Sequence, residues 1–246
     1  MYRNSFIKIA TLAVLLAVAG SGTAFANGPQ VGTTAGNGYE EYTARWWQWM
    51  TSIPSAINPQ DNDGVVDCTL AQQGPVWFLA AAQAGVTAER SCTVQENKPL
   101  FFPLFNALFT NGPGENATVA EKRDALDGVL SDLRPGIFAD FGFPGSRACE
   151  LFVEVDGQTA TYSVPVARVQ SPAFYIDTGD GPSGLTPGVI DPEAISDGFW
   201  VMLPALAPGE HTLHFGGRLC QFDNFDDHPL AGPVDITYHL TVGNEP

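Results

Sequence analysis

The chain has 246 residues and a formal net charge of −16, from 27 acidic and 11 basic residues. A surface this acidic repels nucleic acid and anionic lipid, so we expect neither as a partner. A hydrophobic content of 44%, with 11% aromatic residues, excludes a disordered chain and is sufficient for a domain with a buried core.

Residues 1–26 have the pattern of a secretory signal peptide. Arg3 and Lys8 provide the positively charged start, and Ala24-Phe25-Ala26 matches an A-x-A cleavage site. The apolar run between them has about 11 residues, fewer than the ~20 that a membrane-spanning helix needs. We therefore expect cleavage near Ala26 and a secreted or periplasmic product without a membrane span.

The rest of the chain is predicted to form one domain. Residues 27–37 are rich in glycine and aperiodic, which is typical of a flexible lead-in. No internal repeat divides residues 38–246. These residues are therefore expected to share one core.

The chain has four cysteines: Cys68, Cys92, Cys149 and Cys220. An even number of cysteines in an exported chain predicts two disulfides. Of the three possible pairings we favour Cys68–Cys92 with Cys149–Cys220, because the first pair flanks one compact apolar unit. The alternative, a zinc site with thiolate ligands, lacks the C-x-x-C spacing.

Apolar residues recur with a helical period over residues 39–53 and predict a helix that ends before Pro54. The apolar stripe comprises Tyr39, Tyr42, Trp46, Trp49, Met50 and Ile53. Trp47 lies at the shoulder of this stripe, beside Glu40. An exposed indole face there would suit stacking on a sugar ring, and the alternative is a side chain packed against a neighbouring loop.

A second helix is predicted over residues 119–134. Thr118 and Glu121 have the spacing of a capping box, and Pro135-Gly136 would end the helix.

The other apolar runs are short and separated by turn residues, which predicts strands. They lie at residues 75–82, 99–109, 149–155, 158–169, 172–177, 198–204, 210–216 and 234–242. Asp156-Gly157 predicts a two-residue hairpin turn of type I′. We therefore predict a mainly β protein: a two-sheet antiparallel β-sandwich, jelly-roll-like, with two accessory α-helices. The long connections at 110–118, 178–197 and 221–233 are places where a site could lie.

The four histidines lie near the end of the chain, and strand alternation sorts three of them by face. Glu210 and His214 are predicted to share one face of the first strand, and Asp235 and His239 the outer face of the second. If the two strands pair, two imidazoles and two carboxylates could bind a divalent metal or act as acid and base. The predicted metal ligands are His214, His239 and Asp235. The alternative is an ordinary solvated sheet face.

Three further residues are candidates for a site. His211 shares the face of Leu213 and Phe215, where it is either a hydrogen-bonded core residue or a general base at the floor of a pocket. Lys98 and Asn106 bracket an apolar run and could recognise a substrate carboxylate; the alternative for Lys98 is a surface ion pair.

Four segments together resemble a family of uncharacterised exported bacterial proteins. They are residues 46–54 (WWQWMTSIP), 74–80 (GPVWFLA), 98–106 (KPLFFPLFN) and 209–217 (GEHTLHFGG). The resemblance, which extends to DITYHLTV at 235–242, implies secretion and one shared domain, and assigns no activity to any residue.

Three functions are consistent with these patterns. The first is a carbohydrate-active module that binds or cleaves a glycan, suggested by export, the sandwich fold and the aromatic residues around Trp47. The second is a metal-dependent enzyme that uses the histidines and carboxylates of the last strands. The third is a structural or partner-binding envelope protein without catalysis, which the absence of a G-x-S-x-G, P-loop or H-E-x-x-H motif favours.

Overall fold

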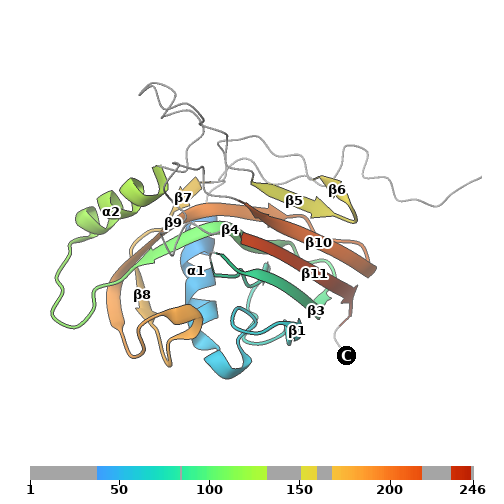
Figure 1. The fold of residues 1–246 in the computed structure, drawn as a ribbon, viewed down its shortest axis with the longest axis horizontal. Helices are drawn as coiled ribbons and strands as arrows, with labels where there is room; N and C mark the ends of the chain where they lie inside the picture. Colours follow the sequence, from blue (N-terminus) through green and yellow to red (C-terminus); the bar gives the residue numbers. More distant parts are fainter. Residues whose placement is uncertain (1–37, 84, 132–150, 160–167, 218–233, 245–246) are drawn as a thin grey trace, which may run out of the picture.

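The computed structural model describes residues 38–83, 85–131, 151–159, 168–217 and 234–244 (Figure 1). The predicted leader and lead-in lie outside these residues. The helices in the described ranges are α1 (Tyr39–Ser52), η1 (Ser55–Ile57), α2 (Val119–Ser131) and η3 (Pro182–Gly184). The strands are β1 (Gly64–Val65), β2 (Trp77–Phe78), β3 (Thr87–Gln95), β4 (Leu100–Phe109), β5 (Phe152–Val155), β6 (Gln158–Thr159), β7 (Arg168–Gln170), β8 (Phe174–Asp177), β9 (Ile190–Leu203), β10 (Gly209–Gly217) and β11 (Val234–Gly243).

The strands form two sheets, as a β-sandwich requires. The six-stranded sheet has the order β1-β3-β11-β10-β5-β6. The five-stranded sheet follows the path β2-β4-β9-β7, and β8 pairs with β9 beside this path. The prediction of a mainly β, two-sheet fold with two helices is confirmed.

Both sheets are mixed, so the prediction of purely antiparallel sheets is wrong. β3 pairs in parallel with both β1 and β11, and β2 pairs in parallel with β4. Turn residues predict only the pairing of strands that follow each other, and such pairs are antiparallel. The partners β3 and β11 lie far apart in the sequence, so no turn between them indicates their direction.

β3 was not predicted and β9 was predicted too short, because both strands bury charged residues. β3 places Ala88, Arg90 and Val94 on its inner face, and the buried arginine interrupts the apolar alternation. β9 begins at Ile190, inside the predicted 178–197 loop, and the part of the strand that lies in that loop includes the buried Asp191 and Asp197. The runs at 99–109, 172–177, 210–216 and 234–242 do form strands.

The core has two apolar layers, one on each face of the five-stranded sheet. On one face, Phe101 stacks on Trp200 with ring centroids 5.2 Å apart, and Trp46 of α1 packs edge-on against Trp200 at 5.4 Å. On the other face, Phe102 lies 4.3 Å from Phe215 of the six-stranded sheet. Helix α1 therefore covers the side of the five-stranded sheet that faces away from the six-stranded sheet.

Local signals predicted both helices and the hairpin correctly. Ile53 is extended before Pro54, so α1 ends where the proline requires. At α2, Thr118 N–H donates to Glu121 at 2.8 Å, and this bond with that of the Thr118 hydroxyl lowers the pKa of Glu121. Asp156 and Gly157 have φ of 53° and 73°, the left-handed pair that a type I′ turn needs.

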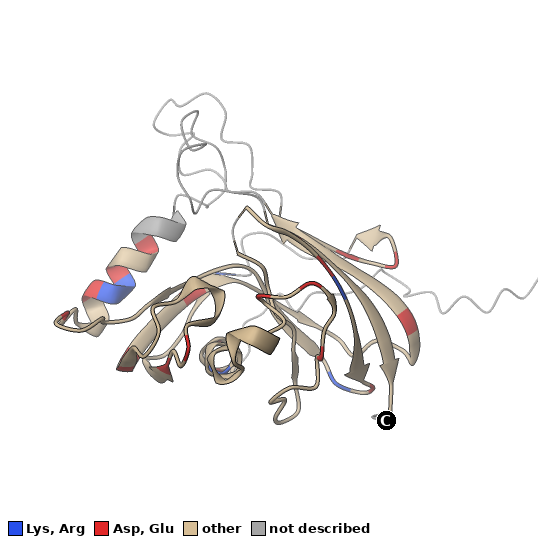
Figure 2. Ribbon diagram, turned by 60° about the horizontal axis from the view of Figure 1, so that its bottom comes forward, with Lys and Arg blue, Asp and Glu red and all other residues tan. Residues whose placement is uncertain are grey.

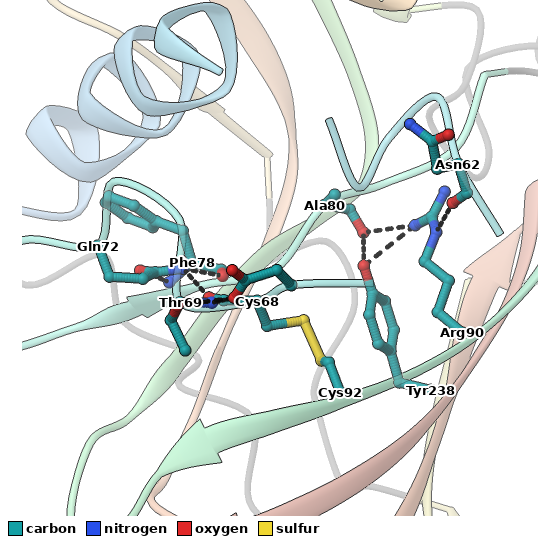
Figure 3. Close-up of a disulfide and its surroundings, with 10 residues drawn as sticks. Asn62, Cys68, Thr69, Gln72, Phe78, Ala80, Arg90, Cys92 and Tyr238 are labelled. Atoms are coloured by element: carbon teal, nitrogen blue, oxygen red, sulfur yellow. Dashed lines mark hydrogen bonds between the residues drawn. A yellow bond between two sulfur atoms is a disulfide. The ribbon is translucent and has the colours of Figure 1, made fainter. Parts of the chain in front are cut away.

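The disulfide Cys68–Cys92 joins the segment after β1 to the inner face of β3 (Figure 3). The predicted pairing is confirmed for these two cysteines. The predicted pair Cys149–Cys220 lies outside the described residues.

Removal of this disulfide is expected to destabilise the protein. The two cysteines are 24 residues apart, and closing a loop of that length in the unfolded chain corresponds to about 3–4 kcal/mol. The double variant Cys68→Ala/Cys92→Ala should therefore lose about this much free energy of unfolding in a urea titration without reductant. An unchanged midpoint and slope would contradict the prediction.

Candidate functional site

The outer face of the six-stranded sheet carries four of the eight predicted site residues, namely Glu210, His214, Asp235 and His239. Leu213 and Phe215 of β10 are fully buried on its inner face, whereas His214 between them faces outward with its side chain 34% exposed. In β11, Tyr238 and Leu240 are buried and His239 between them is exposed. The predicted assignment of the two histidines to one face is therefore confirmed by strand alternation.

His214 lies between two carboxylates from neighbouring strands. Its Nδ1 is 3.3 Å from Glu154 Oε2 of β5, and its Nε2 is 2.8 Å from Asp235 Oδ1 of β11. The register explains this arrangement, because His214 is directly opposite Glu154 and Asp235 is diagonal to it across β11. One imidazole thus contacts the strands on both sides.

An aromatic ring completes the surroundings of His214. Phe152 of β5 is half-buried on the outer face, and its ring centroid lies 4.7 Å from that of the imidazole. Phe152 pairs with Gly216 on β10. A Cβ at Gly216 would lie 3.2 Å from Phe152 Cζ, so the glycine leaves room for the phenylalanine ring. We name Phe152, Glu154, His214, Asp235 and Thr237 the His214 patch.

The second histidine uses a different carboxylate. His239 Nε2 is 2.9 Å from Glu89 Oε1 of β3, and the register places His239 opposite Thr212 rather than opposite His214. Glu210 accepts a hydrogen bond of 3.0 Å from the Thr241 hydroxyl. The two histidines are therefore diagonal neighbours on one face, with their rings bonded to separate acids.

The predicted metal site is not assembled by these contacts. Among the residues that the structure describes, no three His, Cys, Asp or Glu side chains are grouped closely enough to hold a metal ion. Asp235 and His214 contact each other, whereas His239 bonds to Glu89. A divalent metal on this face stays a prediction.

His211 has both ring nitrogens next to protein acceptors. Nδ1 is 2.8 Å from Asp156 Oδ2 in the hairpin turn, and Nε2 is 2.9 Å from the Ala207 carbonyl oxygen. The other carboxylate oxygen of Asp156 accepts the Thr212 N–H at 2.9 Å. These bonds hold the β5–β6 turn against β10. They agree with the predicted alternative that His211 is a hydrogen-bonded structural residue.

Lys98 precedes β4, and Asn106 lies in the second half of that strand. Lys98 Nζ donates to the Gly74 carbonyl at 3.1 Å and lies 5.5 Å from the Trp77 ring centroid. About 20 Å of extended strand separate Leu100, close to Lys98, from Asn106. These two residues do not converge on one position where a carboxylate could bind both.

Trp47 lies in the core. Its side chain is 5% exposed and packs edge-on against Trp46, with ring centroids 5.2 Å apart. The exposed indole face that sugar stacking requires is therefore not offered by Trp47. Helix α1 is packed on both the sheet and the loops beside it, and this buries a wider face than the predicted stripe.

The described part of the chain has few basic residues, and each of them contacts other protein groups. All six of its lysines and arginines contact protein groups: Arg45, Arg90, Lys98, Lys122, Arg123 and Arg168. Acidic residues lie on strands and loops around the described ribbon (Figure 2). Arg90 is the only lysine or arginine in β3, β5, β10 and β11, and it points inward, so the outer face of these strands presents carboxylates and histidines without a lysine or arginine.

The fold and site define a two-sheet β-sandwich with an open, acidic and histidine-containing sheet face. Comparisons with protein-family models, with curated proteins and with solved structures find no match. In the described residues no helix is both long enough and apolar enough to cross a membrane. The chemistry of the His214 patch is therefore the basis for a functional proposal.

Phe152 and Glu154 were missed as site residues. Strand alternation before the predicted turn at Asp156-Gly157 puts Glu154 and Phe152 on the face opposite Val153 and Val155. What local alternation could not supply was the pairing of β5 with β10.

Proposed function

We propose that the His214 patch binds a neutral carbohydrate. A sugar ring offers apolar C–H groups on its face and hydroxyl groups around its edge. Phe152 and the His214 imidazole lie side by side and can contact such a face, and Glu154 and Asp235 flank them as hydrogen-bond acceptors. This juxtaposition of rings with two carboxylates on an exposed sheet face is the observation that carries the proposal.

The charge of the face supports a neutral rather than an anionic glycan. Glu89, Glu154, Glu210 and Asp235 belong to it, and no lysine or arginine of its four strands points outward. A uronate or sulfate group would meet only repulsion from these carboxylates. Carboxylates are strong acceptors for sugar hydroxyls, since hydrogen bonds to charged groups contribute about 1.5–3 kcal/mol.

The expected export of the protein supports a ligand of this class. The leader pattern of residues 1–26 and the disulfide Cys68–Cys92 are both typical of proteins outside the cytoplasm, where polysaccharides are abundant. A partner-binding envelope protein remains the rival, and the experiment distinguishes the two.

Affinity electrophoresis in gels that contain soluble neutral polysaccharides tests the proposal. The panel comprises hydroxyethylcellulose, xylan, glucomannan, mixed-linkage β-glucan and soluble starch. We expect retardation by at least one of these, and His214→Ala should weaken binding about 10–100-fold because it removes one ring and one hydrogen-bonding group.

Glu41→Gln is the matched control, because Glu41 lies exposed on α1, away from the sheet face. It should bind like the wild type, and circular dichroism should show that both variants are folded. Failure of every polysaccharide to retard the protein, or equal retardation of wild type and His214→Ala, would refute binding at this patch.

A further inference from the structure

Both ring nitrogens of His211 face oxygen atoms that accept hydrogen bonds. Nδ1 is 2.8 Å from Asp156 Oδ2, and Nε2 is 2.9 Å from the Ala207 carbonyl oxygen. A carbonyl oxygen has no proton to donate, and an aspartate carboxylate is ionised near neutral pH. A neutral imidazole has one N–H and would direct the lone pair of its second nitrogen at an acceptor, whereas an imidazolium donates to both oxygens. The geometry therefore fits the protonated ring.

Asp156 is the only ionisable group that bonds to His211 in the ranges that the structure describes. Across the sheet, His211 is opposite Leu240 of β11, and β4, β6 and residues 204–208 contain no ionisable side chain. The other ionisable side chains of β5, β10 and β11 bond to different groups: Glu154, Glu210, His214, Asp235, Tyr238 and His239. A proton on His211 is therefore balanced by the Asp156 carboxylate.

His211 lies at the junction between β10 and the β5–β6 hairpin. Four residue pairs join β5 to β10, and β6 is the last strand on the path of this sheet (Figure 1). Beyond these pairs the turn is held by Asp156, whose N–H donates to the Thr212 carbonyl at 2.8 Å and whose carboxylate accepts from Thr212 and His211. The His211 side chain is 11% exposed. Among these bonding groups, the imidazole is the one whose type of side chain changes its charge between about pH 5 and 8.

We propose that His211 is a proton-dependent latch that holds the β5–β6 turn to the start of β10. The imidazolium donates to Asp156 and to Ala207, and loss of its proton removes one of these bonds and the charge opposite the carboxylate. The latch therefore stabilises the folded protein at acidic pH, and this contribution is lost as the pH rises through the range in which histidine titrates. The hairpin carries Phe152 and Glu154 of the His214 patch, but the latch does not depend on carbohydrate binding.

Thermal unfolding at two pH values tests the latch. Glutamine at this position stays polar but cannot hold a proton, so His211→Gln removes the pH-dependent part of the contact. We expect His211→Gln to lower the melting temperature by about 3–6 °C at about pH 5.5, and by less than half as much at about pH 8.5. His239→Gln is the matched control, because His239 is exposed and bonds through Nε2 to Glu89. Its loss should be about 1 °C or less at both pH values.

Asp156→Asn should preserve the latch without the proton. Asparagine tolerates the left-handed φ of 53° at this position. Its side-chain oxygen can still accept the Thr212 N–H, and its amide can donate to Nδ1 of a neutral imidazole whose Nε2–H donates to Ala207. In the Asp156→Asn background, His211→Gln should therefore lower the melting temperature equally at both pH values.

NMR of the ring nitrogens measures the protonation state directly in the wild-type protein. At about pH 7 both nitrogens of His211 should carry a proton, whereas in Asp156→Asn only Nε2 should carry one. A neutral His211 ring in the wild type at this pH, or an equal effect of His211→Gln at the two pH values, would overturn the proposal. Neither measurement involves a carbohydrate, so failure of the latch and failure of the proposed function are distinguishable.

Discussion

Replacement of Lys122 with methionine is expected to lower the free energy of unfolding by about 3–5 kcal/mol. Lys122 of α2 is fully buried, and its Nζ lies 2.5 Å from Asp191 Oδ2 and 2.9 Å from the Glu193 carbonyl oxygen. Methionine keeps the length of the side chain but removes its charge. Asp191 would then be a buried carboxylate without a cation. Such an uncompensated buried charge is the reason why removing one partner of a buried ion pair destabilises a protein strongly.

The loss should depend on pH with a defined sign. Burial alone would raise the pKa of Asp191, but the hydrogen bonds from Lys122 and from the N–H groups of Asn111 and Glu193 lower it overall. A lowered carboxyl pKa stabilises the folded state above the unfolded value of about 3.9, and this contribution is lost as pH falls through the folded pKa. The deficit of Lys122→Met should therefore be largest near pH 7 and smaller near pH 3.

Two further variants identify the cause of the loss. Lys98→Met makes the same change at a half-buried lysine with one carbonyl partner, and should cost less than about 1 kcal/mol. Lys122→Met/Asp191→Asn removes both charges and should recover part of the stability. Urea titrations at pH 7 and pH 3 measure all four proteins, and an equal deficit at both pH values would show that charge burial is not the cause.

Periodic apolar patterns predicted the parts of the fold that depend on neighbouring residues. The stripe of α1 and the alternation around His214 each identified the buried face, because burial of apolar side chains follows the geometry of a helix or strand. The capping box at Thr118 and the turn at Asp156 are also local, and both are present.

The strands that the sequence did not predict correctly bury charged side chains whose bonding partners are far away in the sequence. Arg90 in β3 and Asp197 in β9 are buried where the pattern requires apolar residues, and each depends on partners far away in the sequence. Asp197 forms two bonds with Arg168, at 2.6 and 3.0 Å, across β7 and β9. Nothing in the local sequence shows that a partner exists, so both strands were assigned too short or missed.

The same limit applies to the candidate site. Alternation identified the outward faces of His214 and His239 and grouped them with Glu210 and Asp235, but of these two acids only Asp235 contacts His214. Glu154 and Glu89 come from β5 and β3, whose places in the sheet are set by long-range pairing. Trp47 shows the converse, because a residue off the apolar stripe was buried by tertiary packing.

Replacement of Arg90 with leucine is expected to lower the free energy of unfolding by about 3–5 kcal/mol, because it leaves several buried acceptors unpaired. Its guanidinium donates to the carbonyls of Ala80 and Ala81 at 3.2 and 2.8 Å and to the Tyr238 hydroxyl at 3.0 Å (Figure 3). It also bonds the carbonyls of Gln60 and Asn62 in the loop after α1. One side chain thus joins β3 to β11, to the segment after β2 and to the α1 loop.

The geometry of the guanidinium makes lysine a poor substitute. An ammonium has three donors at one point, whereas the planar fork of Arg90 reaches acceptors on several sides. Arg90→Lys should therefore recover less than half of the stability that Arg90→Leu loses.

Arg45→Leu is the matched control, because Arg45 is exposed and lies 5.4 Å from the Tyr42 ring centroid. Thermal unfolding should show a loss of about 10 °C for Arg90→Leu and almost none for Arg45→Leu. Equal shifts for these two variants would mean that the buried network contributes no more than a surface contact.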